Sequence, residues 1–261
     1  MMSARMSMLA TLRRQLARIE THYGACVTDR AALGHEEADC ALQGGLALGA
    51  MHEVFTEGSR HSAGATGFVL GLTARILRQQ RPLLWVGADF GEREAGGLSM
   101  NGLLELGLDP RLMVTVRASD VEGALRTAAD ALACDALGAV VLEVWGETRH
   151  LDLVASRKLT LAAQSSRVTG FLLRMAASPQ PSTAETRWIV RAAHSPPAAP
   201  GNAPWSVWGT PVFDAQLVRN RHGPAGSWIL EWSDNDERLI LATHAQPVAA
   251  PTFNRSPRQV A

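Results

Sequence analysis

The chain has 261 residues, of which 46% are hydrophobic, and its 25 basic residues balance 25 acidic ones. A chain of this size can bury a full α/β core as one domain with extensions. A formal net charge of zero gives no support for nucleic-acid binding driven by overall charge, so any such contact would be local. The three cysteines are far apart and form no Cys-x-x-Cys pair, which argues against a disulfide framework or a zinc site.

The N-terminus lacks the pattern of a secretory signal. Arg13 and Arg14 are not followed by an apolar run of signal-peptide length. No stretch approaches the roughly 18 uninterrupted apolar residues that a membrane span needs. We therefore expect a cytoplasmic protein without a membrane span.

An amphipathic helix is predicted over residues 8–21. Its apolar side chains recur at three- and four-residue spacing, at Leu9, Leu12, Leu16 and Ile19. Such a helix either packs on its own domain or acts as an arm for a neighbouring subunit or partner, so Leu12, Leu16 and Ile19 are candidate partner contacts. A long polar stretch follows, and residues 1–45 are predicted to form this helix and a linker.

A short strand over residues 51–55, a Gly/Ser-rich turn and an apolar helix from Thr66 form the local architecture of a phosphate-binding loop. The working pattern requires Gly, four residues, and then Gly-Lys-Ser/Thr. Here Gly58 and Gly64 enclose five residues, and Ala65 stands at the lysine position, so only Thr66 of the closing triplet remains. Without the lysine, no cation in the loop reaches the outer phosphates, and we expect neither an ATP/Mg²⁺ cofactor nor enzymatic turnover.

Strands and helices alternate through the middle of the chain. The predicted helices are residues 66–80, 101–106, 121–135 and 151–165, and the predicted strands are residues 82–88, 111–117, 137–145 and 168–173. A Gly-rich loop over residues 91–97 precedes the helix at 101–106. This alternation predicts a mostly parallel α/β sheet with right-handed crossovers.

The second half of the sequence changes character. Strands are predicted at residues 187–193, 212–220 and 227–232, with a fourth candidate at 238–243. A hairpin turn is expected over residues 220–226, and the strands are predicted to be antiparallel additions to the parallel sheet. The Pro-rich residues 195–209 and the tail after Gln246 read as irregular. The predicted core is therefore residues 46–245, followed by a flexible tail over 246–261.

Two carboxylates are candidates for chemistry. Asp89 follows a strand at the edge where open α/β sheets bind ligands. It could orient a water for attack on a phosphate, but without the lysine we favour a carboxylate that caps the loop. Glu143 lies inside an apolar strand, where a carboxylate is costly unless paired. It is either a Mg²⁺-side acid or the partner of an arginine, and we favour the arginine. No histidine pattern predicts a metal site.

Two further pairs are candidates for binding. Arg219 and Arg221 precede the hairpin turn and suit bidentate recognition of phosphate or carboxylate, or else form a solvated strand end. Trp205 and Trp208 lie in a Pro-rich segment, where they could anchor a partner or cover the core.

The order of the segments resembles that of RecA-type recombinases. The matching segments are residues 16–24, 44–53, 84–89, 106–110, 140–143 and 218–221. The resemblance implies a RecA-like fold. It places Asp89 at the catalytic acid, Glu143 at the metal-side acid, and Arg219 and Arg221 at the basic pair that reaches the nucleotide of a neighbouring subunit. The departures are Ala65 at the lysine position and a very short segment, Gly146–His150, where the first DNA-binding loop would be. The fold is kept, but strand exchange is not expected.

Those departures, together with residues 49–55, 151–159, 186–188 and 217–228, resemble the ImuA family, the RecA-like members of the bacterial mutasome. That resemblance implies a role in the DNA-damage (SOS) response. It also implies work alongside ImuB, which is a polymerase-like adaptor, RecA, and an error-prone replicative-type polymerase subunit.

We therefore predict a non-catalytic accessory factor of translesion synthesis and mutagenesis that acts through protein contacts, with self-association as a further option. One alternative is a weak DNA-stimulated ATPase or recombination modulator in which Arg219 and Arg221 supply the missing charge across a subunit interface. Another is a single-stranded DNA-binding module, against which the neutral charge and the short loop count.

Overall fold

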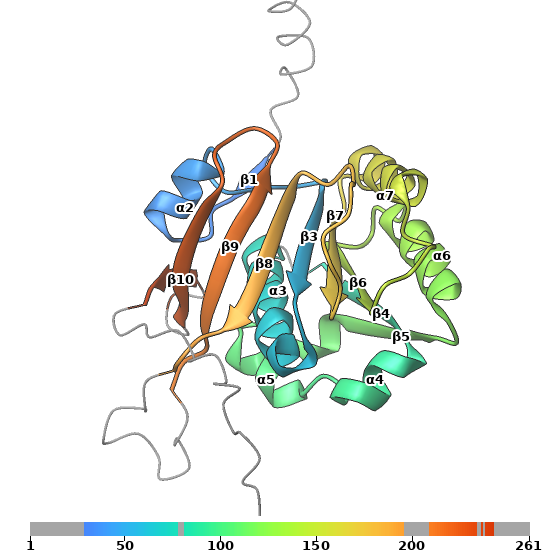
Figure 1. The fold of residues 1–261 in the computed structure, drawn as a ribbon, viewed down its shortest axis with the longest axis horizontal. Helices are drawn as coiled ribbons and strands as arrows, with labels where there is room; N and C mark the ends of the chain where they lie inside the picture. The colour runs from blue at the N-terminus through green and yellow to red at the C-terminus, as the bar shows by residue number, and fades with distance from the viewer. Residues whose placement is uncertain (1–28, 78–80, 196–208, 234–235, 237, 243–261) are drawn as a thin grey trace, which may run out of the picture.

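The computed structural model describes residues 29–77, 81–195, 209–233, 236 and 238–242. Their centre is a nine-stranded sheet of order β11-β10-β9-β8-β3-β7-β6-β4-β5, with helices on both faces (Figure 1). The predicted α/β, RecA-like architecture with a mostly parallel sheet and antiparallel C-terminal strands is confirmed. The predicted N-terminal helix, the tail from residue 246, and Trp205 and Trp208 lie outside the described residues.

The large sheet consists of β3 (Met51–Thr56), β4 (Leu83–Ala88), β5 (Met113–Ala118), β6 (Ala139–Trp145), β7 (Thr169–Met175), β8 (Thr186–Ala192), β9 (Val212–Asn220), β10 (Gly226–Ser233) and β11 (Arg238–Leu241). The α-helices are α2 (Glu36–Ala41), α3 (Ser62–Ile76), α4 (Asp89–Ala95), α5 (Met100–Glu105), α6 (Val121–Leu132) and α7 (Leu153–Ser166). Short 3₁₀ turns occur at Ser59–His61 and Pro110–Leu112, and β1 (Arg30–Ala31) pairs with β2 (Leu46–Ala47) in a small separate ladder.

The inner parallel strands β4, β6 and β7 are mostly apolar because helices cover both faces of the sheet. One core cluster lies on the α3 side, where Phe68 and Val69 meet Trp188 and Phe213. A second cluster lies on the α6 and α7 side and is richer in alanine. The centre of the sheet, β3 and β7, is buried at every residue.

Helix α3 approaches the antiparallel strands closely because glycines line its inner face. A Cβ built on Gly64 would lie 3.1 Å from the backbone of Ala192, and one on Gly71 would lie 3.1 Å from the ring of Trp232. Protein interiors leave no room for such an atom without movement of its neighbours. These glycines therefore set the distance between α3 and the strands β8 to β10.

Strand β8 joins the two halves of the sheet, which corrects the expectation that it belongs wholly to an antiparallel group. It runs parallel to β3 and antiparallel to β9, with a register shift between Arg187 and Trp188. The reason is the long connection over residues 176–185, which returns the chain to the edge where β3 begins. A parallel neighbour requires such a crossover.

Two helices were not predicted. α2 lies in the polar stretch expected to be a linker, and Asp39 within it accepts hydrogen bonds from the backbone N–H groups of Leu33 and Gly34 at 2.7 and 2.9 Å. α4 replaces most of the expected Gly-rich loop. Its Gly91 is needed for space, because a Cβ there would lie 2.8 Å from the indole nitrogen of Trp145.

Candidate functional site

A cleft of about 560 Å³ opens at the carboxyl ends of the parallel strands. Its walls come from the start of α3, from β4, β5 and β6, and from the α4–α5 region, which Figure 1 shows grouped at one end of the sheet. Open α/β sheets place their ligands at this edge. The cleft is therefore the place where the phosphate-loop prediction can be examined.

The loop before α3 is shorter than the sequence indicated. The helix begins at Ser62 rather than at Thr66, because the 3₁₀ turn Ser59–His61 leads directly into it. Gly64, Ala65 and Thr66 are consequently helical, and their side-chain directions differ by about 100° per residue. Only Thr66 of the three lines the cleft, while Gly64 packs on β8.

Ala65 faces the core. Its side chain is 0% exposed and belongs to the apolar cluster on the α3 side of the sheet. A lysine at this position would carry its ammonium into the core rather than toward the cleft, at a high desolvation cost. Ala65 therefore differs from the expected lysine in two ways: it lacks the charge, and its side chain points into the core and not into the cleft.

Glu57, in the turn before α3, pairs with an arginine of the neighbouring strand β8. Arg191 of β8 contacts Glu57 at 2.7 Å and lies 3.7 Å from Asp214. His61 is buried, and its pKa is lowered by burial and by the nearby charges of Arg60 and Arg191. Because Arg191 is already paired, its guanidinium is not free to bind an anion at this turn.

Glu143 reaches the cleft from β6, and its neighbours correct the expected arginine partner. Its carboxylate accepts hydrogen bonds from the indole Nε1–H groups of Trp85 at 3.0 Å and Trp145 at 2.6 Å. Within the described residues no cation pairs with it. The sequence predicted that this carboxylate within an apolar strand needs partners, but the choice of indoles depends on β4 lying beside β6.

Asp89 begins α4 and does not line the cleft. Its carboxylate lies 3.8 Å from the guanidinium of Arg117 on β5, and the same guanidinium contacts Glu92. These groups are all substantially exposed, so the contacts contribute little to stability. Asp89 therefore contacts Arg117 of the neighbouring strand β5 and does not cap the loop as expected.

The cleft does not fit a triphosphate with Mg²⁺. Such a ligand needs a lysine on its outer phosphates and cations to offset charge repulsion. Here the described lining residues include the carboxylates Glu143 and Glu92, and their only cation, Arg117, is already in contact with Glu92. No group of three or more His, Cys, Asp or Glu side chains in the described ranges could hold a metal ion.

Arg219 and Arg221 lie at the opposite edge of the sheet from the cleft. The end of β9 pairs with Thr186, which is level with His52 at the start of β3, whereas the cleft lies beyond the end of β3. The Arg219 guanidinium donates to the carbonyl oxygen of Ser182 at 2.7 Å, and Arg221 lies in the exposed turn after β9. Their proposed reach toward a neighbouring subunit stays a prediction.

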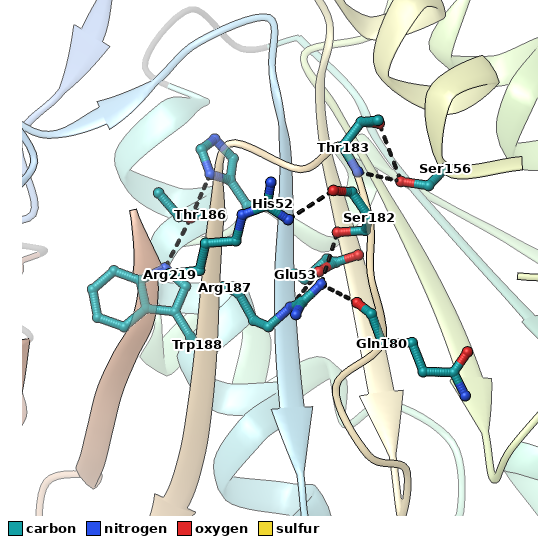
Figure 2. Close-up of polar contacts among 10 residues, drawn as sticks. All are labelled: His52, Glu53, Ser156, Gln180, Ser182, Thr183, Thr186, Arg187, Trp188 and Arg219. Carbon is teal, nitrogen blue, oxygen red and sulfur yellow. Dashed lines mark hydrogen bonds and ion pairs between the residues drawn. The ribbon is translucent and has the colours of Figure 1, made fainter. Parts of the chain in front are cut away.

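A buried polar cluster on β3 and β8 was not predicted from the sequence (Figure 2). Arg187 pairs with Glu53 at 2.7 Å, and the two side chains are 10% and 5% exposed. Arg187 also donates to the Ser182 hydroxyl at 2.8 Å and to the carbonyl oxygen of Gln180. The available signal was a pair of opposite charges, Glu53 and Arg187, each beside large apolar residues in a predicted strand.

The cluster fastens the 176–185 connection to the sheet. Besides the Arg187 and Arg219 contacts, Thr183 donates its backbone N–H to the Ser156 hydroxyl of α7 at 2.9 Å (Figure 2). Further along, Glu147 accepts hydrogen bonds from the Ser178 backbone and the Gln180 side chain at 2.7 and 3.0 Å. The 176–185 connection is therefore bound along its length.

His52 is the second part of this cluster. It is fully buried, with Nδ1 2.8 Å from the Thr186 hydroxyl and Nε2 2.9 Å from the carbonyl oxygen of Ala47. The Trp188 indole donates to the same hydroxyl at 3.1 Å. Because burial disfavours the charged ring, the pKa of His52 is lowered to about 4.

Arg174 ties together the loops that follow β6 and β7. It is buried, donates to the carbonyl oxygen of Gly146 at 3.0 Å and lies 3.7 Å from Glu147. Burial lowers its pKa, although Glu147 and Glu53 oppose that shift. Arg174 therefore holds the backbone of the loop that follows β6.

The fold and the cleft together define a class: a RecA-like α/β protein whose phosphate-loop position carries a core alanine. No family model matches the chain. The chain is 31% identical to Protein ImuA of two strains of Caulobacter vibrioides, NA1000/CB15N and ATCC 19089/CB 15, over 209 residues that cover 74% of this chain and 78% of each relative. The chain belongs to the ImuA family. None of the helices in its described ranges has the length and apolar content that crossing a membrane requires.

Proposed function

We propose that the chain is a non-catalytic, RecA-like accessory factor of SOS-induced translesion synthesis and mutagenesis. It acts in the cytoplasm through contacts with ImuB, RecA and an error-prone polymerase subunit. Membership of the ImuA family supports this role. The observation that carries the non-catalytic part is Ala65, which is fully buried in the core and so leaves the cleft without its phosphate-binding cation.

Equilibrium binding of ATP with Mg²⁺ to the purified chain, with and without single-stranded DNA, tests the non-catalytic part. Calorimetry up to millimolar nucleotide is expected to show no saturable binding, and a phosphate-release assay no turnover. Turnover that disappears in Thr66→Ala would contradict the proposal, because Thr66 is the one residue of the closing triplet that lines the cleft. Glu122→Gln, at an exposed pair on α6, is the matched control for a surface substitution.

The same assay separates the two alternatives. If ATP binds, and the combined variant Arg219→Ala/Arg221→Ala abolishes binding, the guanidinium groups come from a neighbouring copy and the chain is a nucleotide-gated factor. Single-stranded DNA affinity that falls steeply with salt would instead favour a DNA-binding module.

The role in the mutasome needs its own test. Co-purification of tagged chain with ImuB and with RecA after DNA damage is expected to recover both partners. Loss of the chain is expected to lower damage-induced mutation frequency, and Thr66→Ala is expected to restore that frequency fully. Failure to recover either partner would contradict the scaffold role.

A further inference from the structure

Glu143 carries a charge that the described part of the chain leaves unpaired. Its two oxygens accept one indole hydrogen bond each, from Trp85 and Trp145. An ionised carboxylate can accept about four hydrogen bonds, so capacity remains. The two donors are neutral, and the side chain is only half-buried, with its free side toward the cleft.

The surroundings of Glu143 make the cleft acidic. The guanidinium of Arg117 contacts Glu92 and lies 3.8 Å from Asp89, so its charge is offset at the rim. That leaves Glu143 with no counter-charge among the described cleft residues. A cation that entered the cleft would meet an oriented carboxylate instead of a repulsive wall.

Exposed apolar side chains occur on the two helices beside the cleft. Met100, which lines the cleft, is 49% exposed, and Phe90 of α4 and Leu104 of α5, outside its lining, are 59% and 61% exposed. Met100 and Leu104 are four residues apart on α5 and so lie on the same side of that helix. Phe90 packs edge-on against Trp145, which donates to Glu143, so this exposed ring lies one side chain away from the carboxylate.

We propose that this cleft binds an arginine side chain carried on an apolar segment of a partner protein. The guanidinium pairs with Glu143, and the flanking apolar side chains cover Phe90, Met100 and Leu104. A volume of about 560 Å³ accommodates the arginine and part of its neighbours. The inference rests on the proposed protein-contact function and gives the former nucleotide cleft a different ligand class.

The probe is a short peptide, N-acetyl-Leu-Arg-Leu-amide, with a second peptide that has citrulline in place of arginine. Citrulline keeps the shape and removes the charge. Binding is followed on the full chain by the ¹⁵N–¹H resonances of the tryptophan indoles, assigned with Trp85→Phe and Trp145→Phe. The arginine peptide is expected to shift both indole signals, because both donate to the carboxylate that it engages.

Glu143→Gln is expected to weaken the arginine peptide about tenfold or more, the loss that follows from removing a charge-assisted hydrogen bond. Leu104→Gln is expected to weaken it by a smaller factor, about threefold, through the lost apolar contact. Glu122→Gln, on an exposed pair of α6, should leave the affinity unchanged.

Equal binding of the citrulline peptide would overturn the proposal, as would shifts of the two indoles by MgCl₂ alone or by ATP with Mg²⁺ at lower concentration than the peptide. Absence of any indole shift at millimolar peptide would overturn it as well. In that last case the absence of ATP turnover would still stand, so the failure of this inference is distinguishable from failure of the proposed function.

Discussion

Glu53 and Glu143 are two carboxylates in the same sheet with different surroundings. Glu53 on β3 lies 2.7 Å from Arg187 of the neighbouring strand and is almost fully buried. Glu143 on β6 faces a cleft and has only two indole donors among the described residues. Glu143 is the only charged residue of β6, whereas Glu53 shares β3 with the polar residues His52 and Thr56. The charge of Glu53 is neutralised within the fold, and that of Glu143 has no counter-charge among the described residues.

This difference separates a structural carboxylate from a binding one. The Glu53–Arg187 pair fastens the 176–185 connection, since Arg187 also holds Ser182 and Gln180 (Figure 2). The Glu143 carboxylate holds no connection, and its donors come from side chains that line or support the cleft. The role of a charged residue within a strand therefore depends on which side chains of the neighbouring strands contact it.

The largest effect is expected from removal of the Arg187 guanidinium. Arg187→Met should lower the free energy of unfolding by about 3–5 kcal/mol, because it leaves the Glu53 charge buried without a partner. Urea denaturation followed by circular dichroism measures the change. The control is Arg126→Met, at an exposed pair on α6, which should change stability by less than about 1 kcal/mol.

A double variant sharpens this test. Glu53→Leu/Arg187→Met removes both charges together and should recover a large part of the lost stability, as replacement of a buried pair by apolar side chains often does. If the double variant is no more stable than Arg187→Met alone, the damage lies in the released 176–185 connection and not in the unpaired charge.

The second effect comes from His52 and depends on pH. Its pKa is about 4 in the folded chain and near 6.5 when unfolded, so the unfolded state binds more protons between these values. The contribution of His52 is fully present above pH 6.5 and decreases as the pH falls, by about 3 kcal/mol at pH 4. Direct NMR titration of the His52 ring checks the folded pKa.

Carboxylates titrate over part of the same range, so a matched comparison is needed. Unfolding of His52→Gln should depend less on pH between 6.5 and 4.5 than unfolding of the unmodified chain, whereas His150→Gln, at an exposed residue, should leave the dependence unchanged. An NMR pKa for His52 near 6.5 would contradict the assignment of a neutral, buried ring.

The fold was largely predictable because most of its strands and longer helices carry their own hydrophobic period; the short helices α2 and α4 do not. The continuous apolar runs of β4, β6 and β7 and the in-line apolar residues of α6 gave the parallel half correctly. The direction of β8 was not predictable, because a strand of seven residues has the same pattern in either direction. Only the path of residues 176–185 decides it.

The site was predictable only in part. The loss of the phosphate-loop lysine was visible at Ala65, but the burial of that position depends on where α3 begins. The partners of Glu143 follow from β4 lying beside β6, and those of Glu53 from β8 lying beside β3. The order of strands in the sheet decides which residues far apart in the sequence become neighbours. Hydrophobic periodicity carries no information about that order.

The smallest effect tests the comparison most directly. Glu143→Gln keeps an oxygen acceptor for one indole and removes a charge that has no cation among the described residues, so weaker hydrogen bonds are offset by relief of desolvation. We expect the free energy of unfolding to change by about 1 kcal/mol or less. Glu53→Gln, the same substitution at the paired carboxylate, should destabilise the chain more, because it leaves Arg187 buried without its counter-charge. Equal losses in the two variants, measured under the same denaturation conditions, would show that Glu143 is as structural as Glu53 and would remove the physical reason for a ligand at the cleft.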